Sequence, residues 1–267
     1  MLAFFTSKAN AEDIEEIVVV GQSVLEKEVD PLTTTQTIKV ILPSFTWPAG
    51  GYGAFIGYRE RGAQTMHTTV FQNGIPVNGA GSGWYDFGHD IASGEKVKVI
   101  SGANSVMYGS GSIAGTILMT DTIDSSITMK VGAEQKKYIS IAPTDWIQFT
   151  DFSIDQDSVR NDNLEKDTYK NQRAKIIIDA GDFKIYANKV DYAYDYDNCF
   201  DNDGISSNDC LQDGERYTIS VRNEYFTIGR TEETGEYFTE GVSTYFNESS
   251  RDYFRIGDTM NLSKLLQ

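Results

Sequence analysis

The 267-residue sequence is poor in basic residues: it has 23 Lys and Arg against 39 Asp and Glu, which gives a net charge of −16. Phosphate binding requires clustered Lys and Arg, so nucleic acid is excluded as a partner. The chain also lacks any run of about 18 apolar residues, which excludes a membrane-spanning helix. A transmembrane barrel strand needs only about ten residues of alternating character, so a membrane location stays open.

Cysteine and histidine are scarce as well. His67 and His89 lie far apart without a Cys or His partner, so no zinc site is expected. No Ser, His and Asp set with motif context and no supported carboxylate pair is present, and we therefore expect no enzyme activity. Cys199 and Cys210 are the only cysteines. In an exported protein they would form one loop-closing disulfide. In a cytosolic protein they would be two unrelated free cysteines or weak metal ligands.

The first eleven residues bear on export. A short apolar stretch ends in Ala9-Asn10-Ala11, which is typical of the tail of a secretory signal. The alternative is a disordered tail. Export favours the disulfide between the two cysteines.

What the sequence does have is the composition of a β protein, with 15 Tyr, 14 Phe and 24 Gly. Up to Thr122 the predicted strands are short. Thr68–Gln72 is followed by Asn73-Gly74, a strong tight-turn signal, and then by a second apolar run over 75–77. This part of the chain predicts a compact α+β domain with irregular loops.

From Ser125 onward the pattern changes to long runs of period two. The polar face is interrupted at Ile177, and the phase is lost near Thr150 and Asn188. The charged face would meet water outside in a soluble sandwich, and inside in a membrane barrel whose apolar face meets lipid. Tyrosines such as Tyr192 and Tyr194 would suit interfacial girdles or a sandwich core. The alternating apolar residues are Ile127, Met129, Val131; Ala174, Ile176, Ile178, Ala180; and Tyr217, Ile219, Val221.

Residues 109–114, GSGSIA, match a G-x-G-x-x-A dinucleotide fingerprint. That chemistry requires a strand running into the glycines and a helix starting at them. Here eight residues separate the preceding strand, Val97–Ile100, from Gly109, and a short β-branched run, Thr116–Thr120, follows. The glycines therefore join strand to strand, and we reject a nucleotide site.

Three segments together resemble the plug domain of TonB-dependent outer-membrane receptors. The stretch from Val97 to Ile117 resembles the closing motif of that domain, and 61–62 with the hairpin over 70–78 resembles an upstream motif. Residues 15–21 resemble the TonB box through which such receptors are energised. The plug-motif residues are Arg61, Gly62, Asn73, Gly74, Gly102, Tyr108, Gly109, Gly111 and Gly115. The TonB-box residues are Glu15, Glu16, Ile17, Val18, Val19, Val20 and Gly21.

The sequence departs from the family at four positions. Ser101 stands where the family commonly has Arg, Lys98 where it has Glu, Asn73 where it has Asp, and Ala114 where it often has Gly. In the family the Arg and Glu belong to an ion-pair network between plug and barrel. We expect that network to be altered or absent here, since losing both partners together is tolerable.

The resemblance implies an α+β plug domain followed by antiparallel transmembrane β-barrel strands that form an incomplete barrel. We expect a signal-peptide remnant at 1–11, a TonB box and periplasmic segment at 12–24, the plug at 25–123 and about six or seven barrel strands at 124–267. The chain would be a fragment of a longer receptor or a truncated gene product. The implied partners are TonB with its inner-membrane energising complex, outer-membrane lipid and a small-molecule ligand such as a siderophore or cobalamin, with no cofactor.

Two loop regions complete the expectations. Tyr52 and Trp84, in plug loops rich in glycine, are expected to face the ligand. Asp195, Asp197, Asp201 and Asp203 are candidate calcium ligands, but their spacing is not that of the twelve-residue calcium loop, and a solvated extracellular loop clipped by the two cysteines is favoured. The alternative function is an exported β-rich binding module whose acidic loop holds calcium or glycan.

Overall fold

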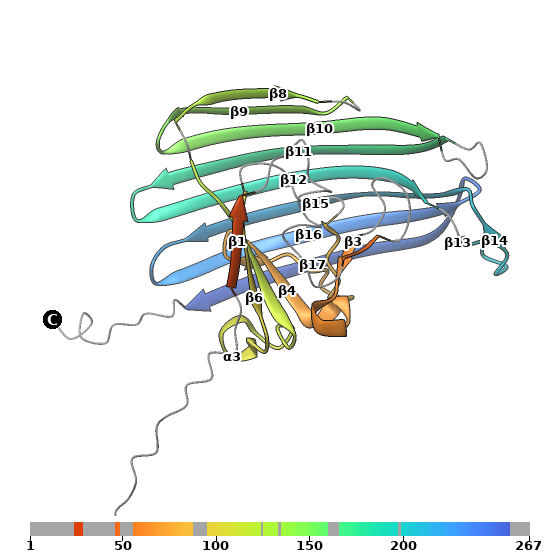
Figure 1. Cartoon of the computed structure of the whole chain (residues 1–267), viewed down its shortest axis with the longest axis horizontal. Helices are drawn as coiled ribbons and strands as arrows, with labels where there is room; N and C mark the ends of the chain where they lie inside the picture. The colour runs from red at the N-terminus through yellow and green to blue at the C-terminus, as the bar shows by residue number, and fades with distance from the viewer. Residues whose placement is uncertain are drawn as a thin grey trace, which may run out of the picture.

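The structure is a computed structural model that describes residues 24–28, 46–48, 56–87, 95–123, 125–132, 135–159, 166–196 and 199–256. The expected signal remnant, the TonB box and Tyr52 lie outside these residues. A small mixed sheet packs against one face of a long antiparallel sheet, as Figure 1 shows. Within the described residues no helix is long and apolar enough to cross a membrane.

The small sheet contains five strands in the order β1-β6-β7-β4-β5. Strands β4 and β7 are parallel and the other pairs are antiparallel. Their core is a cluster of apolar and aromatic side chains that includes Tyr58, Val77, Phe87, Val97 and Ile117. The strands are β1 (Val24–Glu28), β4 (Thr68–Gln72), β5 (Ile75–Pro76), β6 (Glu95–Ser101) and β7 (Gly115–Asp121).

Short elements surround this sheet. They are the paired strands β2 (Thr46–Pro48) and β3 (Ile56–Tyr58), the 3-10 turns η2 (Glu60–Gly62) and η3 (Thr65–His67), and the one-turn helix α3 (Ser105–Tyr108). The sequence analysis did not predict α3, because one turn of helix is too short to produce a period of 3.6 residues.

The glycine-rich stretch joins β6 to β7, as predicted. Gly102 and Gly109 have φ of 98° and 88°, a region that L side chains rarely adopt. A Cβ at Gly111 would lie 2.7 Å from Thr69 Oγ1, and a Cβ at Gly115 would lie 3.2 Å from the Ile100 carbonyl oxygen. These glycines therefore serve left-handed backbone and close packing.

The large sheet has eight strands in the order β17-β16-β15-β12-β11-β10-β9-β8, all antiparallel. This exceeds the six or seven that we expected, because three connections take only two residues each, at 145–146, 181–182 and 240–241. The strands are β8 (Ile127–Val131), β9 (Lys137–Thr144), β10 (Ile147–Val159), β11 (Lys166–Ala180), β12 (Phe183–Tyr196), β15 (Cys210–Arg222), β16 (Phe226–Thr239) and β17 (Val242–Ile256).

In the large sheet the polar face is buried and the apolar face is exposed, which is the reverse of the arrangement in a soluble protein. The polar side chains of β11 and β15 point to the side of the small sheet and are buried, Lys175 and Thr218 among them. The apolar side chains of the other face stay exposed, as Met129 does at 69%. Ile177, which interrupted the polar pattern, is buried on the same face as Lys175. This arrangement matches the barrel interpretation of the alternating pattern and not the sandwich.

Candidate functional site

The β4–β5 hairpin of the small sheet lies against the large sheet at β16. Its turn residues Asn73 and Gly74 have φ of 47° and 94°, the two positive values that a type I′ turn requires. A Cβ at Gly74 would lie 3.4 Å from Thr227 Cγ2. At Gly229 in β16 a Cβ would lie 2.8 Å from Ile75 Cγ2, so this glycine leaves the space that the isoleucine occupies.

A buried ion pair crosses the same interface. Lys175 Nζ, from the middle of β11, contacts Asp121 Oδ1, at the end of β7, and each side chain is 3% exposed. Asn73 Nδ2 donates a hydrogen bond of 2.6 Å to Asp121 Oδ2, and the Asp121 backbone N–H donates one of 3.1 Å to Asn73 Oδ1. Both oxygens of the carboxylate are thus engaged, which a buried charge requires.

Aromatic and cationic side chains extend the interface along β15 and β17. The Arg216 guanidinium lies 5.3 Å from the centre of the Tyr85 ring, and Arg255 lies 5.3 Å from the centre of the Tyr108 ring. Such cation–π pairs gain strength when water is excluded. Tyr108 also packs edge-on against Phe71, at 5.5 Å between ring centres. The plug-motif tyrosine thus contacts both the hairpin strand β4 and the large sheet.

The loop at 79–84 is anchored by hydrogen bonds near both of its ends. Asn78 Nδ2 donates hydrogen bonds to the carbonyl oxygens of Thr68 and Gly83, while its Oδ1 accepts one from the Val70 N–H. Arg251 of β17 donates to the Gly79 carbonyl oxygen at 3.3 Å. Trp84, one of the two expected ligand-facing residues, lies at the end of this loop and is 44% exposed.

Tyrosines cover the plug-facing side of the large sheet near the ends of its longest strands. Tyr192 and Tyr194 are 6% and 4% exposed, and the Tyr194 hydroxyl donates to Gln212. Their burial excludes the interfacial girdle that we considered for them. The ring centres of Tyr237 and Tyr245 lie 5.5 Å apart on the neighbouring strands. This plug-facing side of the large sheet, called the wall from here on, therefore presents aromatic rings and amide groups.

Acidic side chains between the end of β12 and the start of β15 accept hydrogen bonds from β11 and from their own segment. Asp195 Oδ2 accepts from the Thr168 N–H at 2.7 Å and from its hydroxyl at 2.8 Å. Asp201 Oδ1 accepts from the N–H groups of Asp203 and Ile205. Asp197 lies outside the described residues, and no three acidic or metal-ligating side chains converge within those that are described.

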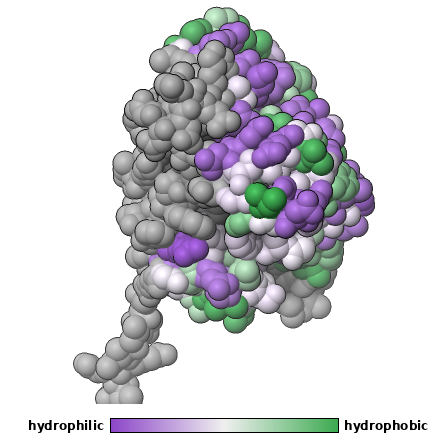
Figure 2. Space-filling view, turned by 90° about the vertical axis from the view of Figure 1, so that its right-hand side faces the viewer, coloured by the Kyte–Doolittle hydropathy of each residue, from purple (hydrophilic) through white to green (hydrophobic). Residues whose placement is uncertain are grey.

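Cys199 and Cys210 form a disulfide at the base of this loop. It encloses the small hairpin of β13 (Cys199–Phe200) and β14 (Ser206–Ser207). Thr239 Oγ1, at the end of β16, donates to the Phe200 carbonyl oxygen at 3.2 Å, which ties the hairpin to the next strand. Figure 2 views the molecule from this end, where hydrophilic residues predominate and hydrophobic ones are scattered among them.

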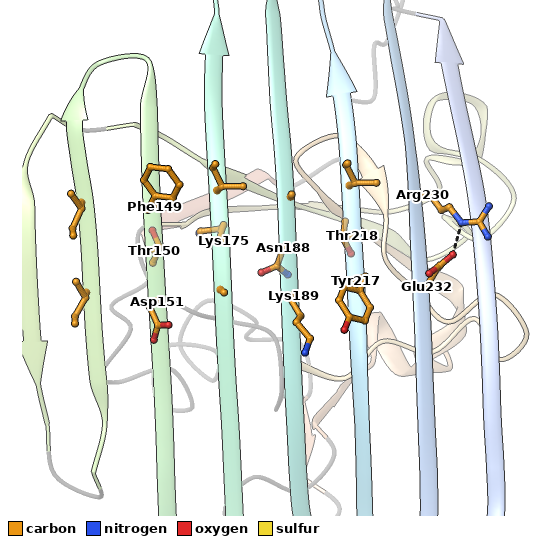
Figure 3. Close-up of a pocket in the computed structure, with 16 residues that line it drawn as sticks. Phe149, Thr150, Asp151, Lys175, Asn188, Lys189, Tyr217, Thr218, Arg230 and Glu232 are labelled. Atoms are coloured by element: carbon orange, nitrogen blue, oxygen red, sulfur yellow. Dashed lines mark hydrogen bonds and ion pairs between the residues drawn. The ribbon is translucent and has the colours of Figure 1, made fainter.

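The opposite face of the large sheet carries a shallow apolar pocket of about 760 Å³ (Figure 3). Ile141, Phe149 and Ile219 are among its lining residues. Ion pairs border it, with Lys189 Nζ 2.8 Å from Asp191 Oδ1 and Arg230 Nε 2.7 Å from Glu232 Oε1. The pocket lies on the outward face, away from the small sheet. Its apolar lining suits contact with lipid better than a ligand site.

The sequence-predicted residues do not converge on one point. Tyr108 and Gly74 lie against the large sheet, and Asn73 bonds to Asp121, which pairs with Lys175 of that sheet. Gly62 has open space around it, and only the backbone of Arg61 is described. Sequence reasoning missed Asp121 and Lys175 as partners. The available signal was a lysine in the middle of a predicted strand, on a face that Ile177 makes partly apolar.

Comparisons with known proteins agree on the type of domain. Residues 9–116 match the family model described as "TonB-dependent Receptor Plug Domain". The chain is 31% identical over 111 residues to the vitamin B12 transporter BtuB of Vibrio vulnificus (strain YJ016), a match that covers 40% of this chain and 18% of that protein.

Two solved structures share the fold. The copper transporter OprC has a TM-score of 0.52 at 14% identity, covering 85% of this chain and 48% of that chain. The ferripyoverdine receptor of the outer membrane of Pseudomonas aeruginosa has a TM-score of 0.51 at 12% identity, covering 81% and 34%. The chain thus spans less than half the length of each of these relatives. Receptors of this family are bacterial outer-membrane transporters and not enzymes. The chain comprises a TonB-dependent receptor plug domain and, following it, long antiparallel strands that match part of the barrel of such receptors.

Proposed function

We propose that this chain is part of an outer-membrane active transporter that takes up a scarce small molecule with energy from TonB. The observation that carries the proposal is the packing of the plug on the buried polar face of a sheet whose other face exposes its apolar side chains. The plug covers the polar wall and so blocks the route by which a small molecule would pass along it. Displacement of the plug would open that route. The outward apolar face would contact outer-membrane lipid.

Energy coupling is assigned to residues 15–21. An extended β-branched segment such as Ile17–Val20 can add as a strand to the sheet edge of a periplasmic partner, with main-chain hydrogen bonds supplying the grip. Strand β1 follows this segment in the chain and lies at the sheet edge remote from the hairpin that contacts the wall. It pairs with β6 from Val24 opposite Ile100 to Glu28 opposite Lys96. A pull on the N-terminal segment would therefore reach this edge strand first.

The ligand is proposed as a small molecule of the siderophore, cobalamin or metal-complex class. The named relatives transport vitamin B12 or copper, or bind ferripyoverdine. Tyr52 and Trp84 remain the proposed ligand-facing residues of the plug. The half-exposed Trp84 ring offers a flat apolar surface at the end of a loop anchored by hydrogen bonds, which favours stacking on a planar ligand.

A cross-linking experiment in cells tests the proposal. A photoreactive amino acid replaces Val19 in the TonB-box segment, and a matched variant carries it at Ile205, which is 64% exposed in the disulfide-bonded hairpin. We expect a cross-link to TonB from position 19 and none from position 205. Equal yields from both positions, or no product from position 19, would contradict TonB coupling.

A further inference from the structure

We infer that Asp121 and Lys175, with Asn73 as the positioning residue, form an ionic latch that fixes the C-terminal end of β7, the central strand of the plug sheet, to the wall of the barrel strands. The ion pair itself is a feature of the structure and does not depend on the proposed function. Its role in transport, as the ion pair that must open before the end of β7 leaves the wall, rests on the proposed function. The latch lies at a different place from the family positions now held by Lys98 and Ser101, both on β6.

The partners come from separate parts of the fold. Asp121 is the last residue of β7 in the plug, while Lys175 lies in the middle of β11, and the sequence between them includes the whole β8–β9–β10 region. Each side chain is 3% exposed, so bulk water does not screen the pair. The chain continues directly from Asp121 towards β8, which places the latch at the junction of the two parts.

Asn73 fixes the carboxylate in the orientation that Lys175 meets. Its amide donates to one carboxylate oxygen, and the other oxygen is left for the ammonium group. An aspartate at position 73 would lack the donor and would set two carboxylates against each other. The departure from the family pattern at position 73 is thus explained by the latch: an amide is required where Asp121 is the neighbour.

Arg222 of β15 supplies a second positive charge nearby. A Cβ at Gly74, next to Asn73 in the hairpin turn, would lie 3.7 Å from Arg222 Cδ. The wall is therefore cationic on two strands where the plug presents Asp121. Removing one partner of a buried pair leaves an uncompensated charge, whereas removing both is often neutral. This difference gives the latch a measurable signature.

Hydrogen exchange on the full chain in detergent, without TonB, tests the latch. The variants are Asp121→Asn, Lys175→Met and the double variant, and the amides to follow are those of Asn73 and Asp121, which bond to Met119 O and Asn73 Oδ1. We expect each single replacement to speed their exchange at least tenfold, and the double variant to return it towards the original rate. Lys184→Met, which removes an ion pair with side chains 51% and 28% exposed, is the matched control and should change the rate less than twofold.

Two results would overturn the inference: single variants that behave like the control, or a double variant whose effect is the sum of the singles. If a single variant does not fold, the double variant and the charge-reversed Asp121→Lys, Lys175→Asp pair decide instead. Folding recovered in either supports the latch, and failure of both contradicts it. Since TonB is absent from this assay, its failure would leave the transporter proposal standing. Conversely, absence of the TonB cross-link would leave the latch standing.

Discussion

The side chain of Asn73 bonds to both the side chain and the backbone of Asp121: its amide donates to the Asp121 carboxylate, and its oxygen accepts from the Asp121 N–H. This reciprocal pair joins the turn of the β4–β5 hairpin to the end of β7. It is buried, with Asn73 3% exposed. The relationship links a residue of the plug motif to the contact between plug and wall.

The first prediction concerns this pair. Asn73→Asp removes the donor and places a second carboxylate beside Asp121, so we expect the plug to lose about 1–3 kcal/mol of stability, the usual cost of an unsatisfied buried polar group. Urea unfolding measures it, followed by tryptophan fluorescence in a chain whose other two tryptophans, Trp47 and Trp146, are replaced by Phe. Asn202→Asp, in the exposed loop, is the control and should change little. If the Asn73→Asp variant unfolds at the same urea concentration as the original chain, the proposed arrangement is contradicted.

The second prediction concerns the fit of the hairpin into the wall. Gly229→Ala would place a Cβ 2.6 Å from the Ile219 carbonyl oxygen and 2.8 Å from Ile75 Cγ2. We expect a loss of about 1–3 kcal/mol from overpacking, seen as a lower melting temperature. Gly81→Ala, where nothing lies within 4 Å, is the control. Equal melting temperatures for the two variants would show that the hairpin does not depend on this gap.

The third prediction concerns the disulfide-bonded hairpin. Replacing Cys199 and Cys210 by Ser releases a short loop whose closure is worth about 3 kcal/mol in the chain-entropy model. We expect protease cleavage within 200–209 to become much faster, while the exchange of β11 amides stays unchanged. A cleavage rate that does not respond to loss of the disulfide would mean that the bond from Thr239 to the hairpin is sufficient.

The fourth prediction tests which face of the large sheet meets lipid. Ile176 and Gln172 lie on the outward face of β11, at different heights. Lys at position 176 should cost about 2–4 kcal/mol on insertion into lipid vesicles, the cost of a charge near the bilayer midplane, and Lys at position 172 much less. Folding yields in vesicles compare the two. Equal yields would contradict a lipid-facing apolar band at Ile176.

Local patterns sufficed for much of the fold. Asn73-Gly74 predicted its turn because both residues tolerate positive φ, and the glycines at 109–115 were correctly placed between two strands because no helical period follows them. The long strands followed from their period of two. Local patterns did not predict α3 or the full number of strands, since one helical turn leaves no periodic signal and two-residue turns leave room for more strands.

The interface itself depends on tertiary contacts that no local pattern encodes. In the sequence Ile177 interrupts a polar face and Asn188 breaks the alternation, and in the structure both are buried on the side of the sheet that the plug covers. The same covering explains why Lys175 tolerates burial: its partner Asp121 comes from another sheet. Which charges meet across two domains is set by their docking, so the latch could not be predicted from spacing.

The measurement that tests the central claim most directly is calorimetric binding of the full chain in detergent to the C-terminal domain of TonB. The original chain is compared with Val18→Pro, which removes a main-chain donor from the proposed strand. We predict heat of binding for the original chain and none for the proline variant, with the fold unchanged. Equal binding by both, or by neither, would contradict coupling through residues 15–21.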